Sequence, residues 1–207
     1  YLLRVTGDGR YGDSMERVLY NTVLGAKPLE RDGHAFYYSD YNVDGSKTYF
    51  PDAWPCCSGT LPQVAADYRI LTYFHDDGGI YVNLYLPSTV KWTSANGAQV
   101  ALTQTGSYPI EGIIKIGLKL SRPSEFAMRL RVPAWSGPVQ KATVRVNGSR
   151  VPVTVHSGFA TLQRKWSDGD RVELDLALPM RLEAIDAQHP DTVALVRGPL
   201  VLFAMTK

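Results

Sequence analysis

The sequence contains few cysteines, and these few are adjacent. Its 207 residues include two cysteines, Cys56 and Cys57. Neighbouring Cα atoms lie about 3.8 Å apart, closer than the spacing of about 4.4 to 6.8 Å that is usual for a disulfide. An ordinary structural disulfide within the chain is therefore excluded, and we expect the pair to be reduced, bound to a metal or linked to a group outside the chain.

The sequence also lacks an excess of charge and a long apolar segment. Lys plus Arg number 22 and Asp plus Glu number 20, so the formal charge of +2 does not favour a nucleic-acid or membrane partner. The apolar runs are far shorter than the about 18 residues of a membrane-spanning helix, and no signal-peptide pattern opens the sequence. Localisation stays open between the cytoplasm, the periplasm and the cell exterior.

Helical patterns dominate the first 76 residues. A capping-box-like start at Asp13 precedes apolar residues at helical spacing, and a second helix is predicted to begin near Ser58 or Thr60. The cysteine pair would then lie immediately before this second helix, where unpaired N–H groups and the helix dipole favour thiolates. An aromatic run over 36–38 indicates a short strand between the helices.

From about residue 78 the pattern changes to short apolar or alternating runs separated by turn residues. Their number and spacing are typical of an antiparallel sandwich or jelly roll. The predicted strands cover 80–86, 99–105, 113–120, 126–132, 142–146, 159–162, 171–176, 181–184 and 193–203. We predict an α+β chain, mainly β, with a helical part over 1–76 and a β-sandwich domain over 77–207.

The cysteine pair is the candidate reactive site. Two thiolates are half of a tetrahedral zinc site, and a thiolate is also a nucleophile. From chemistry alone, a reactive thiolate pair and a pair of small buried apolar residues are equally favoured interpretations. His34 and His75 are not at ligand-like spacing, so the sequence does not contain a complete zinc site.

Ordered motifs along the whole chain resemble glycoside hydrolase family 127, the β-L-arabinofuranosidase family. In the helical part they are YGDSMERVLYN, FYY and CCSGTLPQ, and in the β part GGIYVNLYLPS, AMRLRVPAWS, VRVNG, KWSDGDRVELDL and VALVRGPLVLF. The resemblance implies that residues 1–76 end an (α/α) barrel catalytic domain and that a β-sandwich follows. It also implies that the chain is the C-terminal part of a larger retaining glycosidase.

The resemblance implies a role for each candidate site residue. Cys56 would be the nucleophile and a zinc ligand, and Cys57 a second zinc ligand. Glu16 and Tyr38 match positions that would contact sugar hydroxyls. From its own chemistry, Trp54 either stacks on a sugar ring or packs in the core. A Glu-x-Cys zinc motif and the acid/base glutamate would precede Tyr1, so we expect the chain alone to have little or no activity.

Three hypotheses for function remain. The first is a retaining glycosidase for L-arabinofuranosyl-containing or related glycans, to which this chain supplies the nucleophile, with zinc as cofactor in the full-length protein. The second is a non-catalytic module that binds carbohydrate or braces the barrel. The third is a redox-responsive vicinal thiol site. We expect the parent protein to follow the first hypothesis and the isolated chain to behave like the second.

Overall fold

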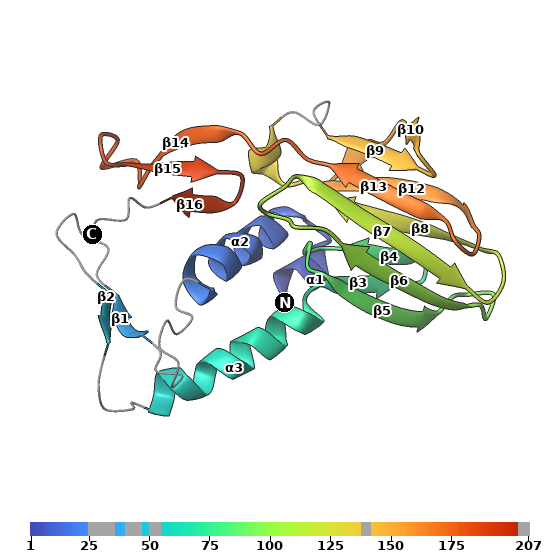
Figure 1. Ribbon diagram of the computed structural model, residues 1–207, viewed down its shortest axis with the longest axis horizontal. Helices are drawn as coiled ribbons and strands as arrows, with labels where there is room; N and C mark the ends of the chain where they lie inside the picture. The colour runs from blue at the N-terminus through green and yellow to red at the C-terminus, as the bar shows by residue number, and fades with distance from the viewer. Residues whose placement is uncertain (25–35, 40–46, 50–54, 138–141, 203–207) are drawn as a thin grey trace. The chain divides into compact units, whose positions relative to one another are not determined.

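A computed structural model describes residues 1–24, 36–39, 47–49, 55–137 and 142–202 (Figure 1). For 36–39, 47–49, 55–59 and 61–62 it describes the backbone alone. The chain forms two compact units, one of residues 1–16 with 72–207 and the other of residues 17–71. Residues 1–16 therefore pack with the β-strands, while the domain boundary expected at residue 76 remains a prediction.

The N-terminal helices are short. Helix α1 (Leu2–Thr6) ends at Gly7, and α2 (Arg10–Val18) continues into a π-helical turn, η1 (Leu19–Val23). The predicted start of α2 at Asp13 is wrong by three residues. The Asp8 side chain accepts a hydrogen bond from the backbone N–H of Arg10 at 3.0 Å, and this local contact satisfies a free donor at the helix start.

The second unit contains helix α3 (Pro55–Ile70) and a small sheet of β1 (Phe36–Ser39) and β2 (Lys47–Tyr49). Strands β1 and β2 pair antiparallel, which confirms the strand predicted over 36–38. Helix α3 contacts η1 within this unit. Among the described residues, no helix is both long and apolar enough to span a membrane.

Two sheets form the predicted β-sandwich (Figure 1). The six-stranded sheet has the order β10 (Ser149–Val151), β9 (Thr143–Val146), β13 (Arg171–Asp175), β7 (Ile113–Leu120), β6 (Gln99–Thr105) and β5 (Ser88–Thr93). The five-stranded sheet has the order β11 (Thr154–His156), β12 (Phe159–Trp166), β8 (Ser124–Arg131), β4 (Gly79–Val82) and β3 (Tyr73–Asp76). The mainly β fold predicted from the sequence is confirmed.

Alternating apolar residues bury the inner faces of both sheets. In β7, for example, Ile114, Ile116 and Leu118 are buried while the residues between them point outward. The Trp92 ring of the six-stranded sheet meets the Phe126 ring of the other sheet at 5.4 Å between centroids. Phe126 in turn lies beside Trp166, which is fully buried and donates its indole N–H to the Phe126 carbonyl oxygen at 3.0 Å.

Pairing within the sandwich is antiparallel except between β4 and β8, which are parallel. Gly79 opens β4 with a φ of 152°, and its Cα faces the backbone of Ala127 so closely that a Cβ would lie 2.0 Å from the Ala127 carbonyl oxygen. The hairpin predicted from Asn147-Gly148 is confirmed: both residues have positive φ and join β9 to β10.

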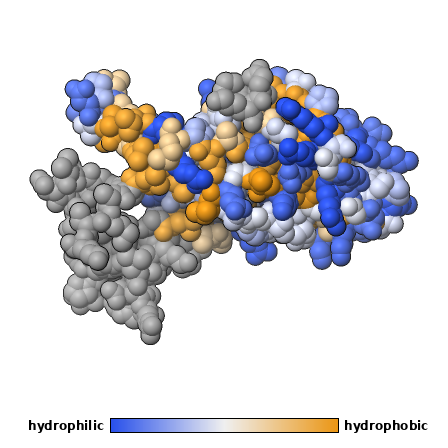
Figure 2. Space-filling model, turned by 45° about the horizontal axis from the view of Figure 1, so that its top comes forward, coloured by the Kyte–Doolittle hydropathy of each residue, from blue (hydrophilic) through white to orange (hydrophobic). Residues whose placement is uncertain are grey.

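A separate three-stranded sheet follows the sandwich, with β14 (Met180–Ala184), β15 (Val193–Arg197) and β16 (Leu200–Leu202). The single strand predicted over 193–203 is wrong, because the chain turns after Arg197 and β16 folds back onto β15. Apolar side chains are exposed on this sheet (Figure 2), and they belong to Met180, Leu182, Val193, Leu195 and Leu202. A turn of 3₁₀ helix, η2 (Ala134–Ser136), follows β8.

Candidate functional site

The cysteine pair lies in the first turn of helix α3. The helix begins at Pro55, so the prediction that Cys56 and Cys57 immediately precede a helix starting near residue 58 is wrong by a few residues. Pro55 suits the first helical position, because its φ is preset and it has no N–H to leave unpaired. The backbone N–H groups of the first turn have no intrahelical acceptor, so both cysteines remain at the positive end of the helix dipole.

Two of the three predicted substrate contacts, Tyr38 and Trp54, fall on residues whose side chains the structure does not describe. Tyr38 is part of strand β1, where the backbone alone is described, and Trp54 lies outside the described residues. The side chains of Cys56 and Cys57 are likewise outside the description. Among the side chains that are described, no group of three or more His, Cys, Asp or Glu residues could hold a metal ion.

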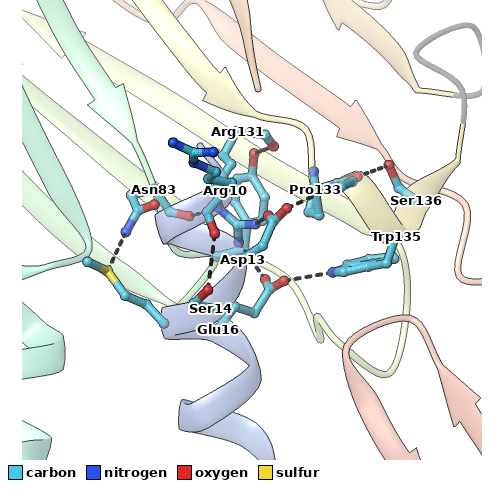
Figure 3. Close-up of polar contacts among 12 residues, drawn as sticks. Arg10, Asp13, Ser14, Glu16, Asn83, Arg131, Pro133, Trp135 and Ser136 are labelled. Carbon is cyan, nitrogen blue, oxygen red and sulfur yellow. Dashed lines mark hydrogen bonds and ion pairs between the residues drawn. The ribbon is translucent and has the colours of Figure 1, made fainter. Parts of the chain in front are cut away.

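Glu16 lies in a buried polar cluster that joins helix α2 to the β-strands (Figure 3). Its Oε1 accepts hydrogen bonds from the Arg131 guanidinium at 2.7 Å and from the Tyr108 hydroxyl at 2.6 Å. Its Oε2 accepts a hydrogen bond from the Trp135 indole N–H at 3.0 Å. Protein groups therefore bind both carboxylate oxygens, and the surroundings of Glu16 do not support the sugar contact predicted for it.

Arg131 is the centre of this cluster and is fully buried at the end of β8. Besides Glu16, its guanidinium donates hydrogen bonds to the Asp13 carboxylate and to the carbonyl oxygen of Asn83. Asp13 also accepts a hydrogen bond from the backbone N–H of Ala134 at 3.0 Å. The Asp13 and Glu16 carboxylates thereby join helix α2 both to Arg131 of strand β8 and to the turn after β8 (Figure 3).

Gly12 gives the Arg131 side chain the space that it occupies. It is a buried residue of helix α2. A Cβ on Gly12 would lie 2.5 Å from Cδ of Arg131 and 2.3 Å from Oδ1 of Asn83. Glycine inside a helix costs about 1 kcal/mol relative to alanine, so its presence here is explained by the close approach of helix and arginine.

The protonation of the cluster follows from its burial and its charges. Burial raises the pKa of Asp13 above its ordinary value, although the Arg131 charge acts in the opposite direction. Burial by itself would lower the pKa of Arg131, but the groups around it, Glu16 first and then Tyr108, Asp13 and Tyr85, together raise that pKa. Burial also raises the pKa of Tyr85, whose hydroxyl donates a hydrogen bond to the Arg131 carbonyl oxygen. Arg131 is accordingly a permanent cation at this join.

Sequence reasoning did not identify Arg131, although a local signal for it exists. The residue stands between Leu130 and Val132, and the whole run is buried. A charged residue enclosed by apolar neighbours in a strand is rarely buried without a partner of opposite charge. Its partners on helix α2 are 115 and 118 residues away in the sequence, so no short-range pattern connects them.

Comparison with known protein families gives two matches. Residues 1–69 match the family described as "Beta-L-arabinofuranosidase, GH127 catalytic domain". Residues 79–180 match the family described as "Beta-L-arabinofuranosidase, GH127 middle domain". The helical part with the cysteine pair thus lies in the catalytic-domain match, and most of the sandwich lies in the other. No curated protein gave a significant match.

Solved structures resemble the chain over almost its whole length. A GH127 β-L-arabinofuranosidase from Geobacillus stearothermophilus T6 superimposes with a TM-score of 0.83 at 27% identity over 97% of this chain. A protein described as a glycoside hydrolase gives 0.80 at 30% identity, and a GH127 β-arabinofuranosidase gives 0.80 at 28% identity, each over 97% of the chain. The chain spans 33, 35 and 34% of the length of these three structures, respectively.

Proposed function

The chain belongs to the GH127 β-L-arabinofuranosidase family, and from this membership we propose that it is part of a retaining glycosidase with Cys56 as its nucleophile. The substrate is a glycan that contains L-arabinofuranosyl or a related sugar. One observation carries the proposal: Cys56 and Cys57 lie in the first turn of α3, inside the stretch that matches the GH127 catalytic domain.

The donor set of this turn fits half of a zinc site. Cys56 and Cys57 supply two thiolates. Zinc in proteins usually has four ligands, which are cysteine thiolates, histidine nitrogens or carboxylate oxygens. When zinc is bound, it keeps these thiols deprotonated near neutral pH. The remaining ligands, from a Glu-x-Cys motif, and the acid/base glutamate would come from residues that precede Tyr1 in the parent protein.

The chemistry assigned to Cys56 has two steps. The Sγ thiolate attacks the anomeric carbon, a C–S bond forms and the glycosidic C–O bond breaks, while the acid/base glutamate gives a proton to the leaving oxygen. Water then attacks the same carbon, the C–S bond breaks, and the water proton returns to the glutamate. Two inversions give net retention, and the Cys56 thiolate is regenerated.

The contacts that hold the sugar are a separate part of the proposal. Tyr38 and Trp54 stay candidates for a hydrogen bond to a sugar hydroxyl and for stacking on a sugar ring. We assign Glu16 to the join between helix α2 and the sandwich, since Arg131, Tyr108 and Trp135 already bind its carboxylate.

The test uses the parent protein, extended upstream of Tyr1 through the Glu-x-Cys region. We expect about one zinc per chain and hydrolysis of p-nitrophenyl β-L-arabinofuranoside. The Cys56→Ser variant should lose hydrolysis. After acid quenching during turnover, peptide mass spectrometry should find a pentosyl group on Cys56. A protein that hydrolyses the substrate but carries the sugar on another residue would contradict the assignment.

Two neighbouring variants separate the roles within the turn. Cys57→Ser should lose zinc and activity without forming a pentosyl adduct at residue 57. Ser58→Ala, which removes a hydroxyl from the same turn, should keep both zinc and activity. Loss of activity in Ser58→Ala equal to that in Cys56→Ser would mean that disruption of the turn, and not loss of the thiolate, explains the result.

One observation favours a second role for the sandwich, as a brace for the helical part. The Arg131 side chain holds Asp13 and Glu16 of α2 against the β-strands with both Arg131 and Glu16 fully buried. If the sandwich is a brace, a substitution of Arg131 should lower the melting temperature of the parent protein and leave its Michaelis constant nearly unchanged. A variant of Arg131 with normal stability would contradict it.

A further inference from the structure

The outer face of the six-stranded sheet has an open cavity of about 780 Å³. Residues of β6, β7, β9 and β13 line it, together with the turns at Asn147-Gly148 and Gly169. Gly117 lies in the middle of β7, directly between Thr103 of β6 and Arg171 of β13 in the strand register. A Cβ on Gly117 would meet no atom within 4 Å, so the missing side chain leaves open space in the centre of this face.

The cavity is rich in positive charge. Lys115, Arg145 and Arg171 contribute three cations, against the single carboxylate of Glu173. Arg145 and Glu173 form an ion pair at 3.0 Å. Lys115 lies opposite Glu173 in the register, but neither Lys115 nor Arg171 forms an ion pair with any residue that the structure describes. Within the described part of the chain, these two cations at the cavity thus have no ion-pair partner.

The lining indicates which kind of ligand would fit. None of the residues that line the cavity is aromatic, so the stacking platform on which neutral sugar rings commonly bind is absent. Thr105 offers a hydroxyl to the hydroxyls of a saccharide. Thr103 already bonds Thr89, and the Asn147 amide already bonds Asp170 and the Arg171 N–H, so each keeps only its remaining hydrogen-bonding capacity for a ligand. Arg and Lys head groups bind carboxylates through charge-assisted hydrogen bonds.

We propose that this cavity binds an acidic oligosaccharide, with a uronate carboxylate on Arg171 and Lys115 and a sugar ring over Gly117. The site is independent of the proposed function, because it uses neither the cysteine pair nor any residue of the catalytic-domain match.

The test is a binding measurement that needs no glycosidase activity. Isothermal titration calorimetry of the intact protein with a linear tetramer of galacturonic acid, at about 0.15 M ionic strength, should show saturable binding. At this ionic strength only close charges interact strongly, since the Debye length is about 8 Å. The fully methyl-esterified tetramer, which has the same rings without the charges, should not bind. Equal binding of both tetramers, or no binding of the acidic one, would overturn the proposal.

Three variants locate the binding. Arg171→Gln should weaken the affinity about tenfold, the usual effect of losing one charged hydrogen bond. Gly117→Val should weaken it at least as much, because the new side chain fills the space for the ring, while the open space around its Cβ keeps the fold intact. Lys91→Gln removes an equal charge from exposed β5 of the same sheet, outside the cavity, and should leave the affinity unchanged.

The remaining outcomes contradict the proposal. An affinity that Lys91→Gln lowers as much as Arg171→Gln would show general attraction to a basic surface. An affinity that Gly117→Val leaves unchanged would place the ligand elsewhere. Equal binding of an acidic tetrapeptide would show an anion site without selectivity for a saccharide.

Discussion

Glu16 and Arg131 are 115 residues apart in the sequence, yet their side chains form an ion pair at 2.7 Å with both groups fully buried. Glu16 belongs to the motif that resembles the catalytic domain, and Arg131 ends a strand of the sandwich. A buried ion pair gains little net stability over apolar residues of similar shape, but removing one partner leaves an uncompensated charge. The pair therefore makes the packing of α2 on the sandwich specific and sensitive to substitution.

Replacing Arg131 with Met should destabilise the protein by about 3–5 kcal/mol, because Glu16 and Asp13 would stay buried without their cation. Urea unfolding followed by circular dichroism measures the change. The double variant Glu16→Met/Arg131→Met should recover part of the loss, since it removes one of the unpaired charges. If the single variant does not fold, Arg131→Lys gives a smaller loss of the same sign. A loss below about 1 kcal/mol in Arg131→Met would be typical of a surface pair and would contradict the buried network.

Gly12→Ala should destabilise the protein, although the same exchange stabilises an ordinary helix by about 0.5–1 kcal/mol. The added Cβ would lie 2.5 Å from Cδ of Arg131, so the arginine must move from its carboxylate partners. Thermal unfolding measures the sign of the effect. Ser14→Ala, at an exposed position of the same helix, is the matched control and should change stability by no more than about 0.5 kcal/mol. A stabilised Gly12→Ala variant would mean that α2 and Arg131 are not packed as described.

Gly79→Ala and Gly117→Ala should have opposite effects on stability. At Gly79 a Cβ would lie 2.0 Å from the Ala127 carbonyl oxygen, and the φ of 152° is unfavourable for any L side chain. We expect a loss of at least about 2 kcal/mol, from backbone strain and the disrupted β4–β8 pairing. At Gly117 the space is open, and alanine should gain up to about 1 kcal/mol by restricting the unfolded chain. Equal effects in urea titrations would contradict the different surroundings of the two glycines.

Asp76 should contribute stability that is lost in acid. Burial tends to raise its pKa, but the hydrogen bond from Tyr81, the charge of Arg129 and the N–H of Gly78 together lower that pKa below 3.8. Because the folded-state pKa lies below the unfolded one, the contribution is complete above the unfolded value and disappears as the pH falls through the folded value. The carboxylate is partly exposed, so the effect should be under about 1 kcal/mol.

Carboxyl-carbon NMR titration measures the pKa of Asp76 directly. Arg129→Gln should move that pKa upward, towards 3.8, since it removes the cation 3.1 Å from the carboxylate. Arg164→Gln is the control, because Arg164 is exposed on β12, the strand that pairs with the β8 of Arg129. It should leave the pKa of Asp76 unchanged. An Asp76 pKa at or above 3.8 in the unchanged protein would show that the three contacts do not form.

Local patterns in the sequence were sufficient for most of the strands. Strands β6 and β7 have the predicted bounds, because alternation of buried and exposed residues over seven or eight positions depends only on the pleat of one strand. The Asn147-Gly148 turn was predictable for a similar reason, since its positive φ values favour these two residue types. The family could also be inferred from the motifs, which preserve residue type and order along the chain.

The tertiary structure alone decided what Glu16 contacts and where the open cavity lies. The partners of Glu16 come from β8, from the turn after it and from Tyr108, and no rule of local spacing relates residues that are about a hundred positions apart. The space above Gly117 exists because β6 and β13, which are distant in the sequence, flank β7 in one sheet. Short-range periodicity thus determined the elements, and long-range packing determined which side chains meet, because contact between distant segments depends on how all the buried faces fit together.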